Sequence, residues 1–515
     1  MTPPFEPAAL LRGSRISNGP SGGETHQGRA RTATKACPSL GSKFPTQDNL
    51  CRSPRTTAPE NRRRERRERQ LNASPDSPNT MRDPREALQS AAQKLSLAAA
   101  AETRFLRDLF GGRRPHPSTE KLAGQNIVIV GGELFNKGAQ AMTFTVVDNL
   151  RRRYPDQDLY LLSYADYERP DAEKEQYSFE ILPWGTEARL GAFTERADFL
   201  SDDENATATI REVMNDCACV VDISGYALSS QWGFNVSFMY LVNLAMASSY
   251  SVPVYVLPQS IGPFEYPPLE AGVLNPLMNL YLSYPEVIYS RERRGVDALS
   301  SYTTHNVEHE LDIVLQNEGY DLENVFTDVP EFETIAVEND AMGVVPNSRV
   351  MERVDHDRFY AHYDAAIEAA LRDGYTVYVL RHSTEDRRIC EQISARFADE
   401  PRVCLLKQDL NAIELERVIE QFDFMIGSRY HSIVHAYKNG VPAIAIGWAD
   451  KYGDLLEEFG QSEFFFDARE PIQRERLVRA VSTLAATNAE ESEKIDRLRS
   501  DIVEGDVFRR TFPPA

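Results

Sequence analysis

From Asn126 onward the sequence alternates short apolar runs with longer amphipathic segments, and this alternation limits the possible folds more than any other feature. The first half contains NIVIV, LYLLSY, ACVVDIS, VPVYVLPQS and EVIYSRE, and the second half contains AMGVVPN, TVYVLRH, VCLLKQ, DFMIGSR and PAIAIGW. Apolar runs of this length between helical patterns are typical of βα units wound around a parallel sheet. The sequence therefore predicts an α/β protein with two Rossmann-like domains, facing each other across a cleft at the carboxyl ends of their strands.

Helical patterns separate the predicted strands. NVSFMYLVNLAMASS and LNPLMNLYLSY read as helices of the first half, and residues 356–374 as a long amphipathic helix that a glycine closes. An acidic, weakly periodic stretch between Val307 and Glu333 is the expected hinge. The predicted parts are a basic tail (1–80), a helix and linker (81–123), an N-terminal Rossmann-like domain (124–310), a C-terminal Rossmann-like domain with the donor site (334–470) and a C-terminal helical segment (471–515).

Length and composition indicate a globular protein without a membrane-spanning helix. With 42% apolar residues, 515 residues can bury the cores of two ordinary domains. No run approaches the roughly eighteen apolar residues that a membrane helix needs, and the N-terminus lacks a signal-peptide pattern. The six cysteines are scattered, which favours reduced structural thiols over a zinc or redox motif. We expect a cytoplasmic protein, with peripheral contact at the membrane face left open.

The formal charge of −21 argues against a nucleic acid partner for the body of the protein. Basic residues concentrate in the first eighty, notably in NRRRERRERQ, and this composition predicts disorder. Three interpretations of the tail remain: an organelle transit peptide, an electrostatic tether, or a start codon assigned too far upstream. The last is favoured, because an amphipathic pattern begins at Met81 and ends at the Gly111-Gly112 pair.

The stretch GSRYHS places polar residues at a predicted strand-to-helix turn. Ser428, Arg429 and His431 fall on the first turn of a helix that begins near Tyr430. Free backbone N–H groups and the positive end of a helix favour an anion there, and an arginine adds a fork suited to phosphate or carboxylate. The turn therefore predicts an anion site.

These residues and several others resemble the polysaccharide pyruvyl transferases, over roughly 126–460. The family has an Arg-x-His at this turn, then a helix, Gly-Val-Pro, a strand and a lysine. Further similar stretches are GGELFNKGAQAM, LPQSIGPF and YSRERRGVDAL. The resemblance implies a two-domain fold like that of GT-B glycosyltransferases, and transfer of the pyruvyl group of phosphoenolpyruvate to a sugar as a ketal, with no cofactor. The implied partners are phosphoenolpyruvate and a sugar or lipid-linked glycan.

The resemblance also suggests roles for individual residues. His431 is the expected general acid, its cationic form favoured by bound phosphate, and Arg429 is expected to act with it. Asp222 and Glu133 are candidates for the base that activates the sugar hydroxyl. The loop FNKGAQA lacks the acid of the Asn-x-Gly-Asp-Glu form that many members have, which bears on the acceptor more than on the donor. The candidate substrate-binding residues are Arg291, Ser428, Asn136, Lys137, Gly138 and Lys451.

Other interpretations of the same residues stay open. Arg429 could pair with a carboxylate in a purely structural role. His431 and His435 have the i, i+4 spacing of zinc ligands, but no third ligand is suggested, so we expect no metal and a core position for His435. Trp232 suits either a sugar platform or packing. A GT-B glycosyltransferase that uses a nucleotide sugar, and a non-catalytic relative that binds a glycan or a protein, are the alternative functions.

Overall fold

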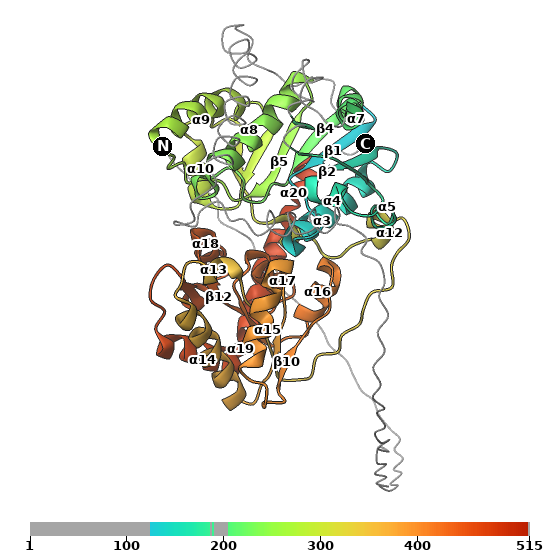
Figure 1. Cartoon of the computed structure of the whole chain (residues 1–515). Coiled ribbons are helices and arrows are strands. Elements are labelled where there is room, and N and C mark those ends of the chain that lie inside the picture. Colours follow the sequence, from blue (N-terminus) through green and yellow to red (C-terminus); the bar gives the residue numbers. More distant parts are fainter. Residues whose placement is uncertain (1–123, 186–187, 190–203, 513–515) are drawn as a thin grey trace, which may run out of the picture. The chain divides into compact units, whose positions relative to one another are not determined.

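The structure, a computed structural model, describes residues 124–185, 188–189 and 204–512. The expectations for residues 1–123, including the basic tail and the helix after Met81, lie outside the described residues. Two parallel sheets dominate the described part, one in each half of the chain (Figure 1). The predicted class, α/β with two Rossmann-like domains, is confirmed.

The first sheet has seven parallel strands in the order β3-β2-β1-β4-β5-β6-β7, so the strand order reverses direction between β1 and β4. Open α/β sheets bind ligands at the carboxyl ends of their strands beside such a reversal. The strands are β1 (Asn126–Val130), β2 (Asp158–Leu162), β3 (Glu180–Leu182), β4 (Cys217–Asp222), β5 (Val254–Gln259), β6 (Val287–Ser290) and β7 (Val307–His309). The helices are α3 (Lys137–Arg153), α4 (Tyr164–Tyr167), α5 (Asp171–Lys174), α7 (Glu204–Asn215), α8 (Gly233–Ser249), α9 (Pro268–Tyr281) and α10 (Arg293–Leu299).

The second sheet has six parallel strands in the order β10-β9-β8-β11-β12-β13. Its strands are β8 (Ala341–Val345), β9 (Thr376–Val379), β10 (Val403–Leu405), β11 (Phe424–Gly427), β12 (Ala443–Gly447) and β13 (Phe465–Asp467). Its helices are α13 (Ser348–Met351), α14 (His356–Arg372), α15 (Arg387–Ala395), α16 (Ala412–Ile419), α17 (Tyr430–Lys438) and α18 (Asp450–Glu458).

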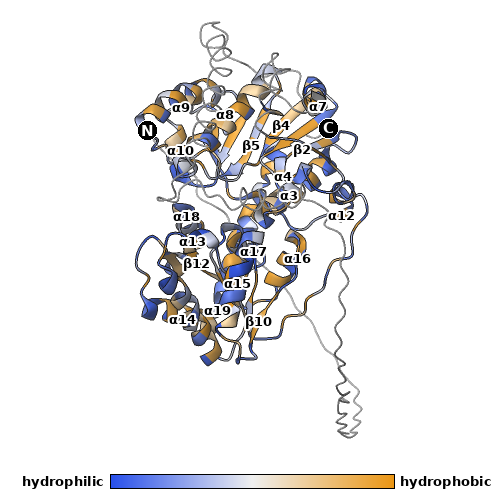
Figure 2. Ribbon diagram, in the orientation of Figure 1, coloured by the Kyte–Doolittle hydropathy of each residue, from blue (hydrophilic) through white to orange (hydrophobic). Residues whose placement is uncertain are grey.

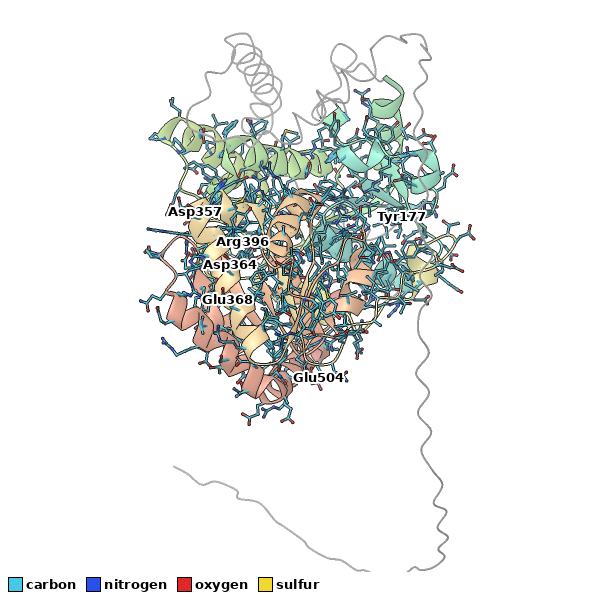
Figure 3. All side chains as sticks on the ribbon, turned by 60° about the horizontal axis from the view of Figure 1, so that its bottom comes forward. Tyr177, Asp357, Asp364, Glu368, Arg396 and Glu504 are labelled. Carbon is cyan, nitrogen blue, oxygen red and sulfur yellow. The ribbon has the colours of Figure 1, made fainter. Side chains whose placement is uncertain are left out.

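Burial explains why the apolar runs form central strands. Every residue of β1, β5, β8, β11 and β12 is buried, as expected for strands covered by helices on both faces. Figure 2 shows the apolar colouring of the β4 and β5 region. In α14, by contrast, buried residues recur with the period of a helix. Its Asp357, Asp364 and Glu368 lie on the outer face in Figure 3, where Arg396 donates to Asp364 at 2.5–3.0 Å.

The segment expected to be a hinge contains regular structure. β7 pairs with β6 and so completes the first sheet, and two short helices follow it, α11 (Ile313–Gln316) and α12 (Leu322–Val325). β7 lies within the predicted range of the first domain, 124–310, and α11 and α12 lie beyond it.

The chain ends with a long helix that reaches both halves. α19 (Arg474–Gly505) packs against α14, α17 and α11, and α20 (Val507–Thr511) follows it. Beyond α20 the ring of Phe512 lies 5.0 Å from that of Tyr255, which belongs to β5 of the first sheet.

Two expectations about the chain can be compared with the described residues. The four cysteines among them, Cys217, Cys219, Cys390 and Cys404, are free thiols, as expected. In the described ranges, no helix combines the length and the apolar character needed to cross a bilayer.

Candidate functional site

The turn between β11 and α17 holds the residues that first suggested an anion site. Ser428 is completely buried below it: its hydroxyl lies 2.7 Å from the Tyr363 hydroxyl, and its carbonyl accepts hydrogen bonds from Asn347 and Tyr452. These contacts hold the turn against α14, α18 and the start of α13. They favour a structural role for Ser428 over contact with a substrate.

Arg429 is the N-cap residue of α17, and its guanidinium is already occupied. It donates to both oxygens of the buried Asp386 at 2.7 and 2.8 Å and also bonds to Glu385. Burial alone would lower the pKa of Arg429, but the two carboxylates outweigh burial and raise it. Both carboxylates belong to the same half of the chain as Arg429, so this pairing supports the structural alternative.

His431 meets the other half of the chain. A Cβ on Gly138, in the first turn of α3, would lie only 2.4 Å from the His431 Nδ1, so the imidazole rests directly on the glycine backbone. On the other side, its Nε2 lies 3.4 Å from Asp312 Oδ2. Burial lowers the pKa of His431 to about 4, although Asp312 acts in the opposite direction. The imidazole is therefore neutral near neutral pH in this structure.

Asp312 was not anticipated from the sequence, yet it connects the site. It caps α11, accepts a hydrogen bond from Arg291 Nη1 at 2.5 Å and faces His431. Burial would raise its pKa, but Arg291 and then His431 lower it overall, so Asp312 is an anion. The signal available in the sequence was an acid directly after a short strand pattern, in a stretch that was assigned to the hinge.

Arg291 lies at the end of β6, where the sequence placed it. Only 3% of the residue is exposed, Nη2 donates to the Gly225 carbonyl at 2.8 Å, and Nε is buried without a partner among the described residues. Its guanidinium lies 5.1 Å from the centre of the Tyr430 ring. Arg291 thus leaves one donor free beside an aromatic ring of the second half.

Lys451, near the start of α18, faces the same ring. Its ammonium lies 4.9 Å from the centre of the Tyr430 ring and 4.5 Å from that of Tyr226. Burial, followed by repulsion from Arg291, lowers the pKa of Lys451 to about 7. No salt bridge to Lys451 occurs in the described part of the chain. Tyr430 therefore gathers three basic side chains around it, Arg291, Lys451 and the neighbouring His431.

Asn136 and Lys137 lie beside this group but have partners. The Asn136 side chain accepts from the Gly138 N–H at 3.1 Å and so caps α3, and its backbone forms a bridge with Ser383 of the second half. The Lys137 Nζ lies 3.5 Å from Asp409, and burial lowers the Lys137 pKa. The structure thus brings the Asn-Lys-Gly loop to His431, with Gly138 making the direct contact.

The two candidate bases differ in their surroundings. Asp222, at the end of β4, is fully buried and accepts from the Ser224 N–H at 2.9 Å and from Gln259 at 3.3 Å. Glu133, in the loop between β1 and α3, has no hydrogen bond or ion pair among the described residues. Burial, followed by the nearby Asp166, raises the pKa of Glu133 to about 7. Glu133 is therefore the better candidate.

The two remaining candidates from the sequence, His435 and Trp232, pack against neighbouring side chains. His435 is completely buried, 3.4 Å from Glu416, and no group of three His, Cys, Asp or Glu side chains suited to a metal occurs among the described residues. Trp232 packs edge-on against Tyr226 and Trp448, at 6.1 and 5.8 Å. These contacts favour packing for Trp232.

Comparison with known proteins agrees with this gathering of residues. The family model described as polysaccharide pyruvyl transferase matches residues 136–450, which include the Asn-Lys-Gly loop, Arg291 and the Arg-Tyr-His turn. The chain belongs to the polysaccharide pyruvyl transferase family. The resemblance inferred from the sequence is thereby confirmed, and it describes a transferase.

Solved structures with a similar fold come from sugar-processing proteins. A glycosyltransferase from Rickettsia africae ESF-5 is 11% identical with a TM-score of 0.44, over 76% of this chain and 100% of that one. A UDP-GlcNAc 2-epimerase from Methanocaldococcus jannaschii is 9% identical with a TM-score of 0.45, over 73% of this chain and 99% of that one. An O-GlcNAc transferase mutant from Thermobaculum terrenum is 12% identical with a TM-score of 0.41, over 76% and 67%.

Proposed function

We propose that this pyruvyl transferase family member transfers the pyruvyl group of phosphoenolpyruvate to two hydroxyls of one sugar residue, forming a pyruvate ketal. Family membership supports the general reaction. The observation that carries the choice of donor is Lys451: its ammonium has no carboxylate partner among the described residues and lies against the same Tyr430 ring as Arg291 and His431. Phosphoenolpyruvate has a phosphate and a carboxylate, and these two anions could neutralise the basic side chains around Tyr430.

The proposed donor position changes the protonation of the site in a useful direction. An anion close to a basic group favours its charged form, so the phosphate would raise the pKa values of His431 and Lys451. His431, which burial keeps neutral in the free protein, then becomes the proton donor expected from the sequence. Asp312, which faces His431 Nε2 and holds Arg291, fixes the relative position of the two residues.

The reaction follows from these positions. His431 protonates the methylene carbon of the donor, which leaves positive charge at the adjacent carbon. A sugar hydroxyl attacks that carbon and loses its proton to a base. The carbon–oxygen bond to phosphate then breaks with its electron pair, and a second hydroxyl closes the ring. The methylene carbon gains one proton and becomes a methyl group, which accounts for the proton of one hydroxyl. The proton of the other hydroxyl leaves with phosphate.

The proposed reaction also bears on the cofactor, the acceptor and the location of the enzyme. No cofactor is needed, because phosphoenolpyruvate is itself the activated donor. The proposed acceptor is a sugar or a lipid-linked glycan, and the proposed location is the cytoplasm, with contact at the membrane face if the glycan carries a lipid.

The test is release of inorganic phosphate from phosphoenolpyruvate in the presence of a panel of simple glycosides. We expect release that depends on a glycoside and on His431, and mass spectrometry should show the mass of a pyruvate ketal on the acceptor. Nucleotide sugars form the comparison arm, measured by thermal shift against phosphoenolpyruvate. Stabilisation by a nucleotide sugar without stabilisation by phosphoenolpyruvate would instead support a glycosyltransferase. No effect of either donor, with glycan binding intact, would indicate a non-catalytic relative.

A further inference from the structure

Two cations beside the proposed reaction centre share one carboxylate. Arg381 lies two residues after the end of β9, its side chain is only 6% exposed, and its Nη2 lies 3.0 Å from Asp409 Oδ1. The Lys137 Nζ lies 3.5 Å from the same oxygen. Neither cation has another ion pair among the described residues. The cluster is therefore locally positive, in a chain whose formal charge is −21.

The contact with Asp409 leaves most of the Arg381 guanidinium unpaired. Its Nε and Nη1 are buried without a hydrogen-bond partner among the described residues, and Nη2 also donates to the Gln408 carbonyl at 3.4 Å. Arg429, by contrast, bonds to both oxygens of Asp386. Because buried N–H groups are normally paired, the free nitrogens of Arg381 indicate a ligand that supplies the missing acceptor oxygens.

Asp409 is easily displaced from this cluster. Its side chain is 61% exposed, and it belongs to the loop between β10 and α16. An ion pair with an exposed carboxylate adds little stability, because water solvates the carboxylate almost as well. Since both cations reach one oxygen of Asp409, a phosphate group in its place can contact both of them. The phosphate also has further oxygens for the planar fork of Arg381.

The cluster lies next to the proposed reaction centre. The Asn136 backbone forms a bridge with Ser383, which joins the segment of Lys137 to that of Arg381. Gly138, the residue after Lys137, supports the imidazole at the reaction centre, where its Cβ would lie only 2.4 Å from Nδ1. An anion held by the two cations therefore belongs to a molecule that reaches this imidazole.

We propose that Lys137 and Arg381 form an acceptor subsite for a phosphate group, and that Asp409 occupies this subsite until a phosphorylated sugar displaces it. This inference rests on the proposed function, which assigns both anionic groups of the donor to the basic side chains around Tyr430. The third anion site is then left for the acceptor. The acceptor class that fits is a sugar joined to a phosphate, as in a glycosyl phosphate.

Paired acceptors test the subsite. A panel of hexose 1-phosphates is compared with the methyl glycosides of the same sugars at saturating phosphoenolpyruvate, and the ratio of the two kcat/KM values is measured. Wild type should prefer the phosphates. Lys137→Gln and Arg381→Lys should each lower the ratio about tenfold or more, because each removes charge-assisted hydrogen bonds to the phosphate. Arg388→Lys, at an exposed arginine of α15, is the control and should keep the ratio.

Asp409→Asn should act in the opposite direction. It removes the carboxylate that competes with the phosphate, so a larger fraction of the protein is ready to bind, and the KM for hexose 1-phosphates should fall several-fold. A purely structural ion pair predicts an unchanged or higher KM, so either result would overturn the role of Asp409. Asp399→Asn, at an exposed carboxyl group of the same half, is the matched control and should leave KM unchanged.

Calorimetric titration with a hexose 1-phosphate identifies the source of the anion. Binding should weaken in Lys137→Gln and should persist at saturating phosphoenolpyruvate, since donor and acceptor occupy different cations. Competition between the two ligands, together with weaker binding of phosphoenolpyruvate to Lys137→Gln, would assign the pair to the donor and overturn the acceptor subsite.

The outcomes separate this inference from the proposed function. If wild type consumes phosphoenolpyruvate but shows no preference for the phosphates, or if Lys137→Gln keeps the preference, the subsite is wrong and the function stands. If wild type does not consume the donor, the function fails, and the titration decides about the two cations alone. Thermal melting checks folding. If the buried Arg381 does not tolerate lysine, Lys137→Gln and the exposed Asp409→Asn decide the question.

Discussion

Arg429 and His431 are two residues apart, but the structure gives them different surroundings. Arg429 bonds to two carboxylates of its own domain, whereas His431 contacts Gly138 and Asp312 of the first half of the chain. The sequence suggested that both residues act on the substrate. The geometry favours a direct role for His431 and a supporting role for Arg429, which fixes the start of α17 through Asp386.

At the scale of single residues, Arg429→Lys tests the supporting role. Lysine keeps the charge but loses the planar fork, so Asp386 would lose one of its two hydrogen bonds and the free energy of unfolding should drop by about 1–3 kcal/mol. Urea unfolding measures this, and Arg396→Lys on the surface is the control, expected to cost less than about 1 kcal/mol. Unchanged stability together with weaker donor binding would return Arg429 to the donor site.

A second prediction at this scale concerns Lys451. Its pKa is lowered to about 7 from 10.5, so between these values the unfolded chain binds more protons than the folded one, and stability should rise with pH across this window. An anionic donor should restore the charged form, so binding at pH 8 should take up a proton. Calorimetry in two buffers with different ionisation enthalpies measures that uptake. Lys451→Met should abolish it and Lys407→Met should not; uptake that persists in Lys451→Met would place the proton elsewhere.

At the scale of elements, the sequence predicted the long buried strands well; of the three-residue strands it predicted β10, in VCLLKQ, but not β3, β7 or β13. NIVIV is β1 without any shift, because five buried apolar residues between turn signals leave little choice. The strands β3, β7 and β13 have three residues each and lie towards the sheet edges, where local sequence carries little pattern. Asp312 and Asp386 were missed for a related reason: each faces a site residue far away in sequence, and only tertiary packing brings such pairs together.

The contact of α3 with α17 gives a prediction at the element scale. Alanine at Gly138 should favour the helix by about 1 kcal/mol, but its Cβ would lie 2.4 Å from the His431 ring. We therefore expect Gly138→Ala to displace His431 and lower kcat at least tenfold, with little gain in melting temperature. Gly272→Ala in α9, where a Cβ meets nothing within 4 Å, is the control and should stabilise the protein without affecting kcat. Normal activity in Gly138→Ala would show that the position of His431 against α3 is not needed.

At the scale of the whole described molecule, the proposed donor site draws on both domains. Arg291, Asp312 and Gly138 come from the first sheet and its loops, and His431 and Lys451 from helices of the second. Their geometry therefore depends on how the domains are joined. Besides the connecting segment, the joint includes α19, which packs along α14 and α17 and leads to α20, where Thr511 bonds to Tyr289 at 3.1 Å. The C-terminal residues thus return to the first sheet and hold it to the second domain.

Phe512 tests this joint. Only 1% of it is exposed, and its ring packs on Tyr255, so Phe512→Ala should lower the free energy of unfolding by about 3–5 kcal/mol. The substitution should destabilise the first sheet more than the second, so amide hydrogen exchange should become faster in β5 and β6 more than in β8 and β11. Leu498→Ala, at a 36% exposed position of α19, is the control and should leave exchange unchanged. If Phe512→Ala keeps its stability but binds the donor more weakly, the C-terminal contact orients the two domains for donor binding and does not stabilise the fold. The two halves would then fold without this contact and lose only their alignment at Tyr430.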